Sequence, residues 1–276
     1  VPLSMLEQLA QIYHSYGYTK IAVGVDTRTS PLLDQLPKSI KTLRHFGEVG
    51  SPLYTSYGCE ILLQFNDELD EKPPEFKERH DYINRTWSIV KTHFDSYSNF
   101  RIFYYILYSK SPRYETEELF ERMSCVNSYK PGELVPSVRE EGFQTLWNQD
   151  PTSLIRLLSE SKCGRVHEFA CKVLKANASH NELITIKNIS TFIISKYKCT
   201  VMFAIDLAQK VFDINKPNFE LIGSFFKCNY VEGRQIARDW IDKTKFSAES
   251  HIELFANLFY NKWQDNRDWI KSYLSR

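Results

Sequence analysis

The stretch "LIRLLSESKCGRVHEFACKVL", Leu154 to Leu174, decides the fold because three later stretches repeat its pattern. It aligns without internal gaps with "NISTFIISKYKCTVMFAIDLA" from Asn188, "LIGSFFKCNYVEGRQIARDWI" from Leu221 and "LFANLFYNKWQDNRDWIKSYL" from Leu254. The starts of these four aligned segments lie 34, 33 and 33 residues apart. A fixed period in this range is typical of repeat architectures, so we number the positions of each segment from 1 and compare them column by column.

Four columns of the alignment are apolar in every segment. They are position 2 (Ile155, Ile189, Ile222, Phe255), position 5 (Leu158, Phe192, Phe225, Leu258), position 16 (Phe169, Phe203, Ile236, Trp269) and position 17 (Ala170, Ala204, Ala237, Ile270). Two apolar stripes separated by a polar middle predict a pair of amphipathic helices joined by a short turn. Neither helix buries its face alone, so stacked pairs are expected to share one core. The alternative is chance similarity, because all amphipathic helices share a period.

Two of the second helices carry a family resemblance. The stretches "GRQIARDWI" and "NRDWIKSYL" resemble the second helix of a HEAT repeat, with Arg234 and Arg267 where that family often has arginine. The first two segments depart from this pattern, with His167 and Val201 in the same column. The period is shorter than the usual HEAT spacing of about 40 and nearer that of tetratricopeptide repeats, but the tetratricopeptide pattern is absent. The resemblance to HEAT or armadillo-like repeats covers Thr152 to Arg276 and implies an all-α fold with an α-α solenoid.

The rest of the chain is expected to be an additional helical N-terminal region. We predict helices at Met5–Tyr16, Leu32–Phe46, Leu53–Phe65, Glu75–Phe94, Phe100–Tyr108, Glu117–Met123 and Ser137–Trp147, with one short strand at Lys20–Val25. The polar stretches 66–81 and 127–136 read as exposed loops. These elements divide into residues 1–125, a linker with a connecting helix at 126–151, and the repeat array at 152–276. More faintly, "YILYSKSPRYE" with "LWNQDPTSLIRLLSES" is similar to segments of bacterial HEAT-like repeat proteins, some carrying a WGR domain, although no such domain is visible here.

Composition narrows the class of protein. Of the 276 residues, 42% are apolar and 25% charged, which is typical of a folded chain. No apolar run approaches the ~18–20 residues that cross a bilayer, so no membrane partner is expected. Six scattered cysteines without C-x-x-C pairs indicate a reduced, cytoplasmic protein. Because the first residue is Val, a processed chain or a part of a larger chain or complex stays open.

The quoted stretch also resembles a metal site. Cys163, His167 and Cys171 are spaced four residues apart, and "HEFAC" is one residue short of H-E-x-x-H. On a helix these three residues span about 12 Å, too far for one zinc ion with ligands at ~2.0–2.3 Å, so we expect no metal and no cofactor. The column of Cys171 varies as exposed positions do. Cys163 instead aligns with bulky residues, which predicts a buried packing position: Tyr197, Tyr230 and Trp263.

Two stretches of the chain resemble segments of an enzyme family. The stretch "AVGVDTRTS", Ala22 to Ser30, resembles a strand segment of phosphohexomutases, and "ASHNE", from Ala178, resembles their phosphoserine loop with Ser179 at the serine. Their D-G-D-x-D-R metal loop is absent, and "ASHNE" falls between two aligned segments, where Asn and Ser favour turns. No phosphate-binding, nucleophile-elbow or dinucleotide-binding glycine motif occurs either. We therefore expect no enzymatic activity.

A binding role is the remaining prediction. Helical solenoids expose long surfaces, so we expect a non-catalytic scaffold or adaptor that binds a protein partner. The HEAT-like alignment implies that four basic residues lie near the inner face and contribute to binding: Arg234, Arg238, Arg267 and Lys271. Solvated charges without a ligand are the alternative for these residues. Residues 151–276 contain 19 basic and 13 acidic residues, so a nucleic-acid-binding protein with a basic concave face stays open.

Overall fold

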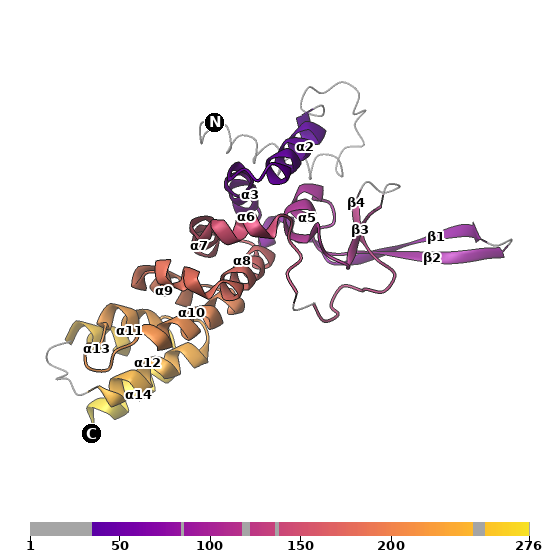
Figure 1. The fold of residues 1–276 in the computed structure, drawn as a ribbon. Coiled ribbons are helices and arrows are strands. Elements are labelled where there is room, and N and C mark those ends of the chain that lie inside the picture. The colour runs from indigo at the N-terminus through magenta and orange to yellow at the C-terminus, as the bar shows by residue number, and fades with distance from the viewer. Residues whose placement is uncertain (1–34, 84–85, 118–121, 136–137, 245–251, 276) are drawn as a thin grey trace. The chain divides into compact units, whose positions relative to one another are not determined.

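The structure is a computed structural model, and it describes residues 35–83, 86–117, 122–135, 138–244 and 252–275 (Figure 1). Its contacts divide the chain into two compact units, one ending at Ala176 and the other beginning at Asn177. The predicted boundary between residues 151 and 152 differs from this division, because the first aligned segment packs with the N-terminal unit. Within the described residues, no helix is both long and apolar enough to cross a membrane.

About half of the described residues of the N-terminal unit are helical. Its described helices are α2 (Gln35–Glu48), α3 (Leu53–Leu63), α4 (Asp67–Asp70), α5 (Arg101–Tyr108), α6 (Gln144–Gln149), α7 (Pro151–Glu160) and α8 (Gly164–Ala176). The predictions for 53–65 and 100–108 are confirmed, and the one for 32–46 is confirmed from Gln35 onward. The predicted helix Met5–Tyr16 and strand Lys20–Val25 lie outside the described residues.

The predicted helix Glu75–Phe94 is wrong, because this stretch forms an antiparallel β-hairpin. Strand β1 (Glu75–Ile83) pairs along its whole length with β2 (Thr86–Phe94), with Ile83 opposite Thr86 (Figure 1). Six of the nine residues in β2 are β-branched or aromatic, which are the types that favour a pleated strand. The four-residue apolar spacing that suggested a helix is therefore coincidental, and the predicted loop over 66–81 also ends where β1 begins.

Two further predicted helices are corrected. The stretch predicted as a helix at Glu117–Met123 contains the end of β3 (Tyr114–Glu117) and the start of β4 (Arg122–Cys125), which pair as a second antiparallel hairpin. The helix predicted at Ser137–Trp147 begins only at Gln144, since Phe143 adopts a left-handed φ of 49° that a continuous helix does not permit. Residues 127–135 lack regular structure, as predicted, although Tyr129 is buried.

The core of the N-terminal unit lies around α3. This helix packs against α2, α5, α6 and α7, and Tyr54 and Trp147 are fully buried beside it with rings 6.0 Å apart. The ring of Trp147 also meets Phe169 of α8 edge-on at 5.0 Å. Burying large aromatic side chains accounts for much of the stability of such a unit. The first aligned segment is thus anchored by residues that lie outside the repeat pattern.

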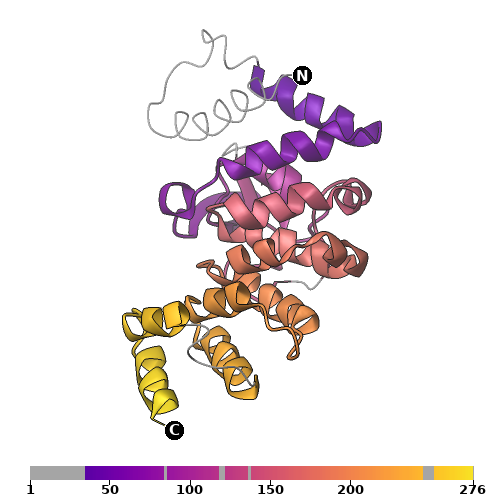
Figure 2. The same ribbon diagram turned by 90° about the vertical axis from the view of Figure 1, so that its left-hand side faces the viewer.

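In the described residues of the C-terminal unit, three helical pairs follow a 3-10 turn at Ala178–Leu183. The pairs are α9 (Ile186–Ile193) with α10 (Lys198–Val211), α11 (Phe219–Phe226) with α12 (Val231–Lys243), and α13 (Ile252–Phe259) with α14 (Gln264–Leu274), coloured orange to yellow in Figure 2. Each aligned segment therefore consists of two helices, as predicted. Position 5 and position 17 are buried in all four segments, from Leu158 and Ala170 to Leu258 and Ile270.

The turn between the two helices is built in the same way in every segment. At position 8 a side chain accepts a hydrogen bond from the backbone N–H two residues later: Ser161 to Cys163 at 3.2 Å, Ser195 to Tyr197 at 3.2 Å, Cys228 to Tyr230 at 3.4 Å and Asn261 to Trp263 at 3.0 Å. Such local side-chain acceptors favour turns over a continued helix. The bond satisfies the N–H of the residue directly before the second helix and so helps to set where that helix begins.

Candidate binding groove between α11 and α13

Two of the four predicted binding residues are buried ion-pair partners. Arg234 and Arg238 of α12 both contact the carboxylate of Asp265, which belongs to α14. Arg234 also donates to the carbonyl of Cys228 at 3.0 Å, and its guanidinium lies 4.3 Å from the ring centre of Trp263. Their side chains are only 8% and 11% exposed. The Nε and Nη1 atoms of Arg234 therefore donate to groups within the protein.

The electrostatics of Asp265 follow from this arrangement. Burial alone would raise the pKa of its carboxyl group, but the hydrogen bonds and positive charges of Arg234 and Arg238 outweigh burial and lower that pKa. The other two predicted residues do not join this cluster: Arg267 donates to the carbonyl of Asn261 in its own segment, and Lys271 is exposed. The four basic residues therefore do not form a single surface.

The apparent metal site in the opening stretch divides into separate contacts. The ring of His167 lies with Nε2 3.0 Å from the carbonyl of Ser161, and the thiol of Cys163 donates to the hydroxyl of Tyr97 at 3.4 Å. Cys163 is fully buried, as predicted, and burial raises its pKa to about 12. Cys171 is also buried, contrary to the exposed position expected for it. Among the described residues, no group of three potential metal ligands converges.

A contact distant in sequence positions the start of α8. The carboxylate of Asp67 accepts the backbone N–H of Gly164 at 3.0 Å and the hydroxyl of Tyr97 at 2.5 Å. An acidic side chain at the first turn of a helix satisfies an otherwise unpaired N–H group and interacts favourably with the helix dipole. The stretch that resembled a metal site is therefore a capped helix N-terminus.

A second polar cluster lies buried in the N-terminal unit. Arg113 forms two hydrogen bonds with the carboxylate of Glu140, at 2.8 and 2.7 Å, and a third with the hydroxyl of Tyr129 at 2.9 Å. Its guanidinium also lies within 5.4 Å of the ring centres of Tyr108 and Tyr114. The cavity beside this cluster measures about 20 Å³, room for about one water molecule. This cluster stabilises the fold and offers no space for a ligand.

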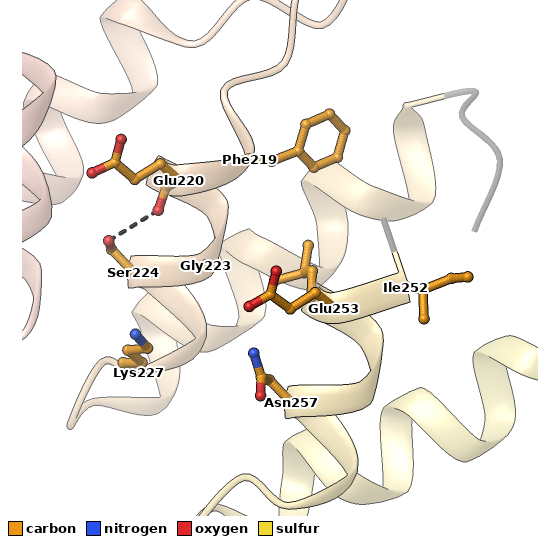
Figure 3. Close-up of a pocket in the computed structure, with 9 residues that line it drawn as sticks. Phe219, Glu220, Gly223, Ser224, Lys227, Ile252, Glu253 and Asn257 are labelled. Atoms are coloured by element: carbon orange, nitrogen blue, oxygen red, sulfur yellow. Dashed lines mark hydrogen bonds between the residues drawn. The ribbon is translucent and has the colours of Figure 1, made fainter. Parts of the chain in front are cut away.

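A groove of about 630 Å³ lies in the C-terminal unit. It lies between α11 and α13, as Figure 3 shows, with Glu253 and Asn257 on the side of α13 that faces α11. Gly223 lines the groove, and a Cβ atom added there would be in ordinary van der Waals contact with the side chain of Leu254 at 3.6 Å. Ser224, also small, turns its hydroxyl back to the carbonyl of Glu220 at 3.0 Å (Figure 3).

The groove combines apolar and acidic side chains. Phe219 and Ile252 are apolar residues of its lining, and Ile252 is 67% exposed. Glu220 and Glu253 are both exposed carboxylates, while Lys227 supplies one positive charge. A mixed apolar and negatively charged groove suits a segment that presents apolar anchors beside basic side chains.

The alignment contained a signal for this groove that our sequence interpretation missed. Phe219 and Ile252 both stand two positions before the start of their segments, and Glu220 and Glu253 stand one position before it. The equivalent apolar residue of α9, Ile186, is 38% exposed. We compared only columns inside the aligned segments, so these outward-facing positions were not considered.

Comparisons with known proteins add no family to this description. No protein-family model matches the chain, and neither the curated proteins nor the solved structures contain a significant match.

Proposed function

We propose that the aligned segments form a HEAT-like α-α solenoid that acts as a non-catalytic scaffold and binds a protein partner in the groove between α11 and α13. The observation that carries this proposal is the groove itself, whose lining includes the apolar residues Phe219 and Ile252 and the acidic residues Glu220 and Glu253. Exposed apolar residues rimmed by charges are typical of protein-binding surfaces. The partner would contribute a segment with apolar anchors flanked by Lys or Arg.

The charges of the groove favour a protein over a nucleic acid. Nucleic-acid binding requires several Lys or Arg side chains that face the phosphate backbone. The groove has one Lys and two Glu, and Arg234 and Arg238 are occupied by Asp265. Phosphates would be repelled by the carboxylates and would compete with Asp265 for the two guanidinium groups. The nucleic-acid alternative therefore rests only on the overall excess of basic residues in the sequence.

A non-catalytic role is supported by the state of the titratable groups. Burial raises the pKa of the thiols of Cys59, Cys125 and Cys163 to about 12, which leaves almost no thiolate nucleophile at neutral pH. The buried Arg113 and Glu140 neutralise each other. The side chains in the groove are exposed, and we see no arrangement of nucleophile, base and orienting group among them.

The proposal is tested by comparing groove variants in affinity capture from the source cell lysate. The wild-type chain and a double variant, Glu220→Lys with Glu253→Lys, are used as bait, and the eluates are analysed for protein and nucleic acid. Reversing both charges should release a partner with basic side chains. The matched control is Glu232→Lys, which changes an exposed carboxylate on α12 outside the groove.

Three outcomes separate the alternatives. A protein retained by the wild type and by Glu232→Lys, but lost with the groove variant, supports the proposal. Proteins retained equally by all three baits contradict binding in the groove. Recovery of nucleic acid, together with binding to duplex DNA that weakens steeply with salt, would favour the alternative function.

A further inference from the structure

Successive segments of the C-terminal unit contact each other through a repeated set of interactions. Ile193, at position 6 of the second segment, is fully buried, with its Cδ1 atom 3.6 Å from where a Cβ atom on Gly233 of the third segment would lie. From the turn of the third segment, Asn229 donates its side-chain amide to the carbonyls of Ile194 and Ser195, at 3.3 and 3.4 Å. The end of one first helix is thus covered by the next segment.

The third and fourth segments make a similar contact, although its amide donors and carbonyl acceptor stand at other positions of the alignment. Phe226, at position 6 of the third segment, is 1% exposed, and its ring lies 5.5 Å from that of Trp269 of α14. Its carbonyl accepts hydrogen bonds from the side-chain amides of Asn261 and Asn266, at 3.4 and 2.9 Å. We call the apolar side chain at position 6, together with the carbonyl groups at the end of the first helix, the receiving edge of a segment, because the next segment packs on it. The following segment supplies an amide from its turn and the face of its second helix.

The fourth segment presents the corresponding edge with its side chains exposed. Phe259, at position 6, is 39% exposed, whereas its equivalents Ile193 and Phe226 are at most 1% exposed. Tyr260 follows it and is 91% exposed. This receiving edge, defined as Phe259 and Tyr260 with the carbonyl end of α13, lies at the other end of α13 from Ile252 and Glu253 of the groove.

We propose that this receiving edge binds a helical hairpin of a partner protein, which continues the stacking of the aligned segments. The hairpin would place an Asn or Gln amide of its turn on the last carbonyls of α13, and small or flat side chains of its second helix over Phe259. Continuity with two established contacts inside the chain supports this occupant. A second copy is disfavoured because the corresponding surfaces of the third and fourth segments already cover the preceding segments. The proposal uses the equivalence of the segments and is independent of the groove.

The proposal is tested by extending the chain with one more helical hairpin of its own sequence. The full chain is extended after Arg276 by a second copy of residues 244–276, which preserves the 33-residue spacing. If the edge receives a hairpin, helical circular dichroism increases, and the urea midpoint rises by on the order of 0.5 M in a single transition with a larger m-value. An extension that stays unfolded and leaves the midpoint unchanged would overturn the proposal.

Two variants locate the contact. Phe259→Asp and, separately, Tyr260→Asp should shift the midpoint of the unextended chain little, because both side chains are already exposed, but should cancel the gain in the extended chain. An equal decrease in the urea midpoint of the extended and the unextended chain would show that Phe259 and Tyr260 do not contact the added hairpin.

The molecular mass of the unextended chain is measured over a range of concentrations. A dimer that dissociates when Phe259 is replaced by Asp would overturn the proposal of a different partner protein. It would show that a second copy of the chain binds at this edge. The double variant Glu220→Lys with Glu253→Lys should not change the gain in urea midpoint of the extended chain. The proposal for the edge can therefore hold even if the proposal for the groove is wrong.

Discussion

Arg234 of α12 donates its single Nε–H to the carboxylate of Asp265 in α14, shared between the two oxygens at 2.9 and 3.1 Å. The same carboxylate also binds Arg238, so one acidic side chain holds two buried guanidinium groups and joins the third aligned segment to the fourth. Charged hydrogen bonds of this kind are stronger than neutral ones. Their loss is costly mainly because a buried charge is left without a partner.

Replacing Asp265 by Asn should destabilise the C-terminal unit by about 2 kcal/mol. This is below the ~3–5 kcal/mol that breaking a fully buried pair costs, because the Asp265 side chain is 29% exposed. The matched control is Asp268→Asn on the same helix, which removes an exposed carboxylate and should change stability by less than about 0.5 kcal/mol. Urea unfolding curves measure both, and equal effects would show that the two arginines do not depend on Asp265.

The stabilisation by Asp265 should disappear in acid. Its pKa in the folded protein lies below the ordinary value of 3.8, so its contribution is complete above that value and is lost as the pH falls through the lower folded-state pKa. The difference in urea midpoint between the wild type and Asp265→Asn should therefore be constant between about pH 5 and 7 and shrink below about pH 4. A difference that grows on acidification would contradict the direction of this pKa shift.

Two glycines should respond in opposite ways to an added methyl group. At Gly233 of α12, a Cβ atom would lie 2.6 Å from the sulfur and 3.0 Å from the Cβ atom of Cys228, so Gly233→Ala should destabilise the protein by about 1–3 kcal/mol. At Gly223 of α11, the nearest side-chain atom is at 3.6 Å. Gly223→Ala should therefore be neutral or stabilise the helix by up to about 1 kcal/mol. Thermal or urea unfolding of both variants checks this, and a loss of stability in both would contradict it.

The cysteines should differ sharply in reactivity. Five of the six are buried, and Cys199 is half-buried. We expect one fast-reacting thiol at pH 8 in the folded protein, since thiols of pKa about 12, such as Cys163, carry almost no thiolate there. A chromogenic disulfide reagent measures the reaction, with six thiols expected after unfolding in urea. Cys199→Ser should abolish the fast phase, and a fast phase that persists would show that another thiol is accessible.

Arg113 should not tolerate replacement by Lys. Both Arg113 and Glu140 side chains are 4% exposed, and a Lys ammonium cannot reproduce the two parallel hydrogen bonds of a guanidinium group. Arg113→Lys should therefore cost about 3 kcal/mol, measured by urea unfolding. The control is the exposed pair of Lys91 with Glu78, where Lys91→Gln should cost less than about 1 kcal/mol. Similar costs at both positions would contradict the structural role of the buried pair.

The candidate site was only partly predictable. The helices that carry the groove were predicted, because the apolar columns of α11 and α13 follow a local period. The groove itself depends on the distance between two helices from different segments, which sequence spacing does not define. Arg234 and Arg238 were chosen from their family-like positions, but their burial depends on Asp265, which lies 31 and 27 residues further along the chain.

The sequence by itself determined the paired helices of residues 151–274, because the spacing of apolar side chains along a helix is a local property that repeats at a fixed period. Tertiary structure decided the rest. The stretch Glu75–Phe94 carries apolar residues at helical spacing, yet it forms two strands, because each strand supplies the hydrogen bonds that the other lacks. Likewise, Cys163 and His167 looked like metal ligands until the contacts with Tyr97 and Ser161 assigned each a different partner. The helical spacing of these residues encodes neither the pairing of the two strands nor the contact of Cys163 with Tyr97, which lies 66 residues away in the sequence.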